Sequence, residues 1–91
     1  MKLTINDLID IVIEQVTSYL NHLSFLDNVK DKLLQAYDVG FIVAPLKDKG
    51  YINDFEVQCE IHPDDPNWVL VTLAYQEKPK DEFKILKFTI G

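Results

Sequence analysis

Residues 50–75, "GYINDFEVQCEIHPDDPNWVLVTLAY", decide the fold because their polarity alternates with the two-residue period of a β-strand. In the first half of this stretch, apolar side chains fall at every second position and polar side chains fall between them. The apolar positions are Phe55, Val57, Cys59 and Ile61, and the polar positions are Asp54, Glu56, Gln58, Glu60 and His62. The alternation predicts a half-buried strand over residues 51–62 with one face in solvent.

A second strand is predicted over residues 68–76, after the turn sequence "HPDDPN". One of its faces carries Val69, Val71, Leu73 and Tyr75, and the other carries Trp68, Leu70, Thr72 and Ala74. A strand that is largely apolar on both faces is usually central or covered. After the polar break "QEKPKDE", the segment "FKILKFTI" predicts a third strand over residues 83–90, with a bulge near Ile85. Leu86, Phe88 and Ile90 share one side of that strand.

Two helices are predicted before these strands. Apolar residues recur at intervals of three and four from Ile5 to Leu23, which is the spacing of a helix with a buried face. A second stripe predicts a helix over residues 25–38, which Gly40 ends because glycine tolerates a left-handed backbone. Residues 41–44 then predict a short strand or a packed loop, which Pro45 stops.

The order of these elements indicates the α+β class. We expect a single domain over residues 1–91, in which two N-terminal helices pack on one face of a small antiparallel sheet of three to four strands. A chain of 91 residues has room for one modest core. Because a fold of this size has limited stability of its own, neighbouring subunits can supply part of it.

The charge of the chain argues against a nucleic-acid or membrane partner. The formal net charge is −6, from 15 acidic residues against 9 lysines, and arginine is absent. Binding to phosphate groups or to an anionic membrane needs a basic face, and arginine is the side chain that usually forms paired hydrogen bonds to phosphates and base edges.

The single cysteine excludes an internal disulfide and fits a reducing compartment. Acidic residues interrupt the apolar N-terminal segment, so we expect a cytosolic chain with neither a signal peptide nor a membrane span.

The sequence carries no recognisable catalytic constellation, so we expect no enzymatic activity, cofactor or metal. Its two histidines, His22 and His62, fall on different elements, and its three glycines are isolated rather than gathered in a phosphate-binding loop. Cys59 is expected to act as a small apolar residue on the inward face of its strand. Trp68 is open to two interpretations, core packing or an interface that also uses Leu70.

Acidic residues cluster around the first predicted strand, at Asp54, Glu56, Glu60, Asp64 and Asp65. Three interpretations stand side by side. The carboxylates could bind a hard cation, if their oxygens converged on one point. They could mimic nucleic-acid phosphate and block a DNA-binding partner. They could also form a solvated strand face that discourages unwanted pairing at a sheet edge.

From Lys49 to the C-terminus the chain resembles the C-terminal domain of contractile-tail sheath proteins, which build myophage tails, R-type pyocins and related injection systems. The matching segments are "KGYINDFEVQCE", "WVLVTLAY" and "DEFKILKFTI". Gly50, Ile52, Phe55, Val57, Cys59, Pro79, Glu82 and Phe83 fit positions of the family pattern. The chain departs from the pattern at Glu60, where the family has Asp, and in a shorter loop before Trp68. The large outer domains of sheath proteins are absent. In size the chain is similar to the sheath-initiator (baseplate) family, although that family's Glu-Pro-Arg motif is missing.

The resemblance implies a structural role without catalysis. In such sheaths, terminal arms of neighbouring subunits add strands to a small sheet, and alternating pockets set the register of the added strand. Residues 54–61 are then the expected acceptor edge, and residues 83–90 the donated or pairing strand. The expected partner-binding residues are Phe55, Val57, Cys59, Ile61, Trp68, Leu70, Phe83, Ile85, Leu86, Phe88 and Ile90. The expected partners are copies of the chain or tail sheath, tube or baseplate proteins, in the host cytoplasm during assembly and then in the virion or injection particle. The alternative function is a small acidic phage-type inhibitor of a host nucleic-acid-binding defence protein.

Overall fold

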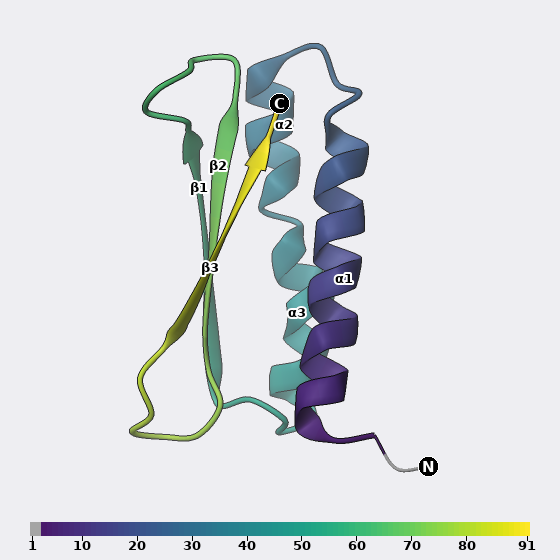
Figure 1. Ribbon diagram of the computed structural model, residues 1–91, viewed down its shortest axis with the longest axis vertical. Coiled ribbons are helices and arrows are strands. Elements are labelled where there is room, and N and C mark those ends of the chain that lie inside the picture. The colour runs from purple at the N-terminus through teal and green to yellow at the C-terminus, as the bar shows by residue number, and fades with distance from the viewer. Residues whose placement is uncertain (1–2) are drawn as a thin grey trace.

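The computed structural model describes residues 3–91 as two layers, with helices on one side and a three-stranded sheet on the other (Figure 1). The chain is therefore an α+β protein. Its elements, in order, are α1 (Ile5–Leu23), α2 (Val29–Ala36), α3 (Val39–Asp48), β1 (Asp54–Ile61), β2 (Val69–Gln76) and β3 (Lys84–Ile90).

The expectation of two N-terminal helices is wrong, because residues 3–91 form three, and of the three to four strands expected three are present. Residues 41–44, expected as a strand or packed loop, lie inside α3, so the helical part of the chain continues to Asp48 and the sheet has three strands. The helix forms because Val39, Val43 and Leu46 recur at helical spacing and are all buried. Pro45 lies within this helix and does not end it. The backbone instead leaves the helix at Gly50, which has a φ of 78° that favours glycine.

Local hydrogen bonds define where the first two helices begin. At α1, the Thr4 side chain accepts from the backbone N–H of Asp7, and the Asp7 carboxylate accepts from the N–H of Thr4. Hydrogen bonds to the Asp7 carboxylate, first from the Thr4 N–H and then from the Thr4 side chain, hold the pKa of Asp7 below its ordinary value. At α2, the Asn28 side chain accepts from the N–H of Lys30. The helix therefore starts at Val29, whereas the sequence pattern predicted residue 25.

The sheet is an antiparallel meander in the order β1-β2-β3. Val71 on the central strand pairs with Cys59 on β1 and with Phe88 on β3, so side chains at these three positions face the same side. On β2 the side chains alternate between buried and half-buried positions. The buried set, Val69, Val71, Leu73 and Tyr75, faces the helices and forms the sheet side of the core.

Each part of the helical layer covers a different part of the sheet. The long helix α1 contacts β3, α3 contacts β1, and α2 contacts both β1 and β2 (Figure 1). The hydroxyl of Tyr19 on α1 donates to the carbonyl of Gln35, 2.9 Å away, and so ties the two parts of the helical layer together. Burial, and then the nearby Asp38 carboxylate, raise the pKa of Tyr19. In the described part of the chain, no helix combines the length and apolar character needed to cross a membrane.

Candidate interaction site at the free edge of the sheet

The sheet has two edge strands, β1 and β3. Among residues 3–91, each of them pairs with β2 alone, so the outer side of each edge strand has no strand beside it. A strand edge of this kind presents a row of main-chain donors and acceptors that another chain can use. The details of the β1 edge determine what it can bind.

The main chain of β1 presents its groups alternately to β2 and to the free side. The N–H of His62 donates to the carbonyl of Trp68 at 2.8 Å, which places even-numbered residues of this strand toward β2. By alternation, Val57, Cys59 and Ile61 direct their N–H and C=O groups away from β2. The carbonyl of Cys59 agrees with this assignment, because it accepts from the Tyr37 hydroxyl of the helical layer at 3.1 Å.

Most of the outward-facing main-chain groups of β1 are available. The N–H of Phe55 is occupied, because it donates to the Asp54 side chain at 2.9 Å, and the Cys59 carbonyl has the Tyr37 hydroxyl. Within the described chain, no acceptor takes the outward N–H groups of Val57, Cys59 and Ile61. Three consecutive outward donors are therefore free for an added strand.

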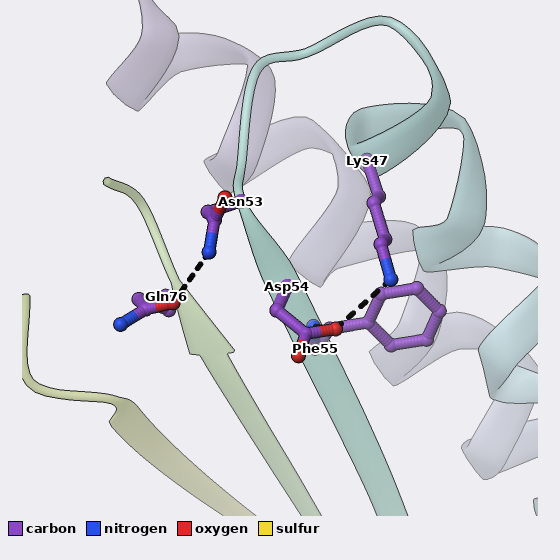
Figure 2. Close-up of polar contacts among 5 residues, drawn as sticks. All are labelled: Lys47, Asn53, Asp54, Phe55 and Gln76. Atoms are coloured by element: carbon purple, nitrogen blue, oxygen red, sulfur yellow. Dashed lines mark hydrogen bonds and ion pairs between the residues drawn. The ribbon is translucent and has the colours of Figure 1, made fainter. Parts of the chain in front are cut away.

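Polar side chains hold the beginning of β1 in place (Figure 2). Lys47 near the end of α3 reaches the Asp54 carboxylate at 3.0 Å, and the Asn53 amide donates to the Gln76 side chain at 2.7 Å. The hydrogen bond from Lys47 and that from the Phe55 N–H lower the pKa of Asp54. These contacts anchor β1 to α3 on one side and to β2 on the other, so the edge is presented on a fixed strand.

Exposed apolar side chains of the helical layer lie on the same flank as the β1 edge. Leu34, Tyr37 and Phe41 are spaced by three and four residues, and residues 37 and 38 keep helical backbone angles, so the three side chains share one side of the α2–α3 segment. Their exposed fractions are 68%, 49% and 81%. Tyr37 is the one that reaches the outward carbonyl of Cys59, which places this side next to the free edge. We call Leu34, Tyr37 and Phe41 the apolar flank.

The structure divides the expected partner-binding residues between the two faces of the sheet. Those on the helix-facing side are Phe55, Val57, Cys59, Ile61, Leu86, Phe88 and Ile90. In this group Cys59 and Ile90 are buried in the core, while Ile61 is exposed. Leu70 and Ile85 lie on the outer face, with Trp68 and Phe83 just before their strands, and no helix of residues 3–91 covers that face (Figure 1).

The outer face of β1 is acidic. Glu56 and Glu60 lie there, with Gln58 between them. Across the sheet, the partners of Glu56, Gln58 and Glu60 are, in that order, Ala74, Thr72 and Leu70. The amide of Gln58 donates to Glu56 at 3.0 Å. The acidic cluster does not converge: in residues 3–91, no group of three or more His, Cys, Asp or Glu side chains is placed to hold a metal ion.

The side chains with catalytic potential lie apart and have structural contacts. Burial raises the pKa of the Cys59 thiol to about 11, so the thiol stays protonated at neutral pH. His62 accepts from the N–H of Asp64 in the loop between β1 and β2, and His22 lies edge-on to the ring of Phe25 at the end of α1. No nucleophile and base are paired in the described residues.

The apolar flank is the part of the site that the sequence pattern missed. The sequence pattern predicts a helix that includes Leu34 and Tyr37 and a strand or packed loop over residues 41–44, so it does not place Phe41 on the same side as Leu34 and Tyr37. The useful signal was the spacing of Leu34, Tyr37 and Phe41, which continues the helical period past Gly40. Comparison of the chain with protein-family models, with curated proteins and with solved structures finds no match.

Proposed function

We propose that this chain is a non-enzymatic structural component of a contractile phage tail or injection system, sheath-like or of the sheath-initiator type, which binds neighbouring subunits by strand addition. The observation that carries the proposal is the unpaired β1 edge, with three outward donors and an apolar flank beside it. The resemblance of residues 49–91 to sheath C-terminal domains supports the kind of assembly.

Main-chain groups supply the generic part of the binding. A fourth strand beside β1 would accept from the N–H groups of Val57, Cys59 and Ile61 and would donate to carbonyls on the same side. The Tyr37 hydroxyl leaves the second lone pair of the Cys59 carbonyl available to such a strand. Edge strands that are not meant to pair are often blunted by bulges, prolines or inward-pointing charges, and β1 has none of these between Val57 and Ile61.

Side chains supply the specific part. Alternate residues of an added strand would face the helical layer and pack against Tyr37 and Phe41. Burying a phenylalanine side chain that is otherwise exposed contributes about 1.5–3 kcal/mol, so Phe41 alone could account for a tenfold to hundredfold change in affinity. On the opposite face the added strand would lie next to Glu56 and Glu60. We therefore expect a partner strand with apolar residues on one face and lysine or arginine on the other.

The partner in this proposal is another copy of the chain or a tail sheath, tube or baseplate protein. Assembly takes place in the host cytoplasm, and the assembled protein resides in the virion tail or injection particle. Net negative charge and the absence of arginine support a protein partner over nucleic acid or an anionic membrane.

Hydrogen exchange of single amides tests the strand addition. In the isolated chain, the outward amides of Val57, Cys59 and Ile61 should exchange faster than those of Gln58 and Glu60, which face β2. On mixing with purified sheath or baseplate proteins, the outward amides should become protected, while Gln58 and Glu60 serve as internal controls. Unchanged exchange at all three outward amides, with the chain remaining monomeric, would refute the proposal.

A pair of matched substitutions tests the role of the apolar flank. Phe41→Ser should leave the stability of the isolated chain within about 0.5 kcal/mol, because the ring is already exposed, but should weaken assembly at least tenfold. Phe25→Ser is the control, because Phe25 is equally exposed but lies between α1 and α2. If both variants assemble like the native chain, the flank takes no part in binding.

The acidic outer face of β1 favours a second function, a phage-type inhibitor that occupies the nucleic-acid groove of a host defence protein. Glu56 and Glu60 point away from the helical layer, as a phosphate mimic requires. Their replacement by glutamine, together with Asp64→Asn and Asp65→Asn, should abolish such inhibition. Inhibition that survives these four changes, or that is never detected, rules this function out.

A further inference from the structure

Lys32 on α2 is a buried charged side chain without a charged partner. Its exposed fraction is 7%. Among residues 3–91, the ion pairs join Lys47 to Asp54 and Lys84 to Glu77, and neither includes Lys32. An ammonium group in the interior is costly unless it is paired or its end reaches solvent. In the described chain, no side-chain nitrogen or oxygen is both fully buried and without a hydrogen-bond partner. The amino group of Lys32 forms no hydrogen bond in the described chain. It therefore cannot be fully buried and must reach solvent.

The amino group of Lys32 meets solvent in an open cavity of about 640 Å³. The cavity lies where α2 begins, beside the N-terminal end of β2 and the C-terminal end of β3. Its lining on the helical side is formed by Asp27, Asn28, Val29 and Lys32, and on the sheet side by Asn67, Trp68 and Gly91. A second copy of the chain or the β1 edge is not needed to form this cavity.

The donors around the cavity are suited to an anion. Within the described residues, the backbone N–H groups of Val29 and Asp31 in the first turn of α2 have no acceptor, whereas the N–H of Lys30 is taken by Asn28. The free N–H groups and the helix dipole make this end of α2 partly positive. The indole N–H of Trp68 is a further donor without a partner in the described chain.

We propose that the cavity binds a carboxylate group. Lys32 and the free N–H groups at the start of α2 attract a single negative charge, whereas the acidic Asp27 in the same lining opposes a more highly charged anion such as doubly charged phosphate. The aromatic ring of Trp68 covers the apolar atoms that carry the carboxylate. This ring lies close to Gly91, because an added Cβ at residue 91 would be 2.6 Å from it, so a larger residue there would require the ring to shift. The source of the carboxylate is an acidic residue of a bound polypeptide or a small carboxylic acid, and the site is independent of strand addition at β1.

Trp68 is the only tryptophan, so its indole N–H gives a single NMR signal that reports on the cavity. The ¹⁵N-labelled full chain is titrated at constant ionic strength with sodium acetate and with N-acetyl-glutamate amide. The uncharged probe is N-acetyl-glutamine amide, and the doubly charged probe is inorganic phosphate. We expect a saturable shift of the indole signal with one or both carboxylates and none with the uncharged amide. A preference for the glutamate compound assigns the site to acidic polypeptide residues, and equal binding assigns it to carboxylates in general.

Two variants connect the signal to Lys32. Lys32→Met, which keeps the volume of the side chain, should weaken carboxylate binding at least tenfold, whereas the exposed control Lys30→Gln should bind as the native chain does. The carboxylate should also raise the melting temperature of the native chain and leave that of Lys32→Met unchanged, which tests the site without the NMR signal. Absence of a saturable shift, equal affinity in Lys32→Met, or tighter binding of phosphate would overturn the proposal.

Discussion

Proline at two neighbouring positions of β1 should have very different effects on folding. Proline has no N–H and restricts φ to about −65°. In Gln58→Pro, the lost N–H is one that faces β2, where Gln58 pairs with Thr72. In Val57→Pro, the lost N–H faces the free edge and has no acceptor in the described chain. Because the two positions are adjacent and carry the same change, differences in local sequence are small.

The size of the difference follows from the hydrogen bonds. Gln58→Pro removes a sheet bond and leaves the carbonyl of Thr72 without its donor, a combined loss of about 2–4 kcal/mol. Val57→Pro keeps every bond to β2 and loses part of a half-buried valine contact, about 1 kcal/mol. The two variants should therefore differ by roughly 2 kcal/mol in their free energies of unfolding.

Urea unfolding followed by circular dichroism measures this difference. With a denaturant slope of roughly 2 kcal/mol/M for a small protein, the midpoints of the two variants should differ by about 1 M. Val57→Pro should also remain monomeric and should not join sheath or baseplate proteins, although it folds. Equal midpoints, or a lower midpoint for Val57→Pro, would show that the Val57 N–H is bonded within the fold and that β1 has no free donor there.

Three further predictions concern the contacts around this edge. Tyr37→Phe removes the hydroxyl that donates to the Cys59 carbonyl, and in a thermal scan it should lower the free energy of unfolding by about 0.5–1.5 kcal/mol. Tyr51→Phe is the control, because the Tyr51 hydroxyl has no hydrogen bond in the described chain. If Tyr37→Phe lowers the free energy no more than Tyr51→Phe does, the prediction is wrong. The lowered pKa of Asp54 means that its carboxylate stabilises the fold above its ordinary value of 3.8, and that this contribution is lost as the pH falls through the lower folded value. Asp54→Asn and Lys47→Gln should therefore lower the melting temperature at pH 7, with a difference from the native chain that disappears in strong acid; a difference that persists there excludes the ion pair as its cause. The raised pKa of Cys59, about 11, predicts slow alkylation by iodoacetamide at pH 8 in the folded chain and rapid alkylation in urea, and equal rates in both would show that the thiol is not buried.

The strands could be predicted closely because their signal is local. The alternation from Phe55 to Ile61 needs only neighbouring residues, and the structure has β1 over Asp54–Ile61, inside the predicted 51–62. The apolar character of both faces of residues 69–75 agrees with the central place of β2, which has neighbours on both edges and helices on one face. Helix α1 covers the same residues as the predicted helix, because a long apolar stripe at helical spacing runs through the whole segment.

The segment after residue 38 could not be predicted from local signals, because they conflict. Gly40 and Pro45 are both typical of a helix end or a break, and the apolar run from Phe41 to Ala44 suits a strand as well as a helix. Burial of Val39, Val43 and Leu46 against the rest of the core outweighs these local preferences. The same helix carries Phe41 onto the exposed flank, so the error in the fold and the missed part of the site have one cause.

The sequence by itself determined the periods of the elements and the acidic character of β1, because both depend on residue type and spacing along the chain. Only the tertiary structure decided which edge of the sheet has an apolar flank, since Tyr37 and Cys59 are 22 residues apart and meet only when α2 packs over β1. It also decided that Lys32 is buried, because the sequence shows a lysine in an amphipathic helix but not the strand ends that cover it. Contacts between distant segments depend on how all the layers pack together, and this packing is not encoded at any one position.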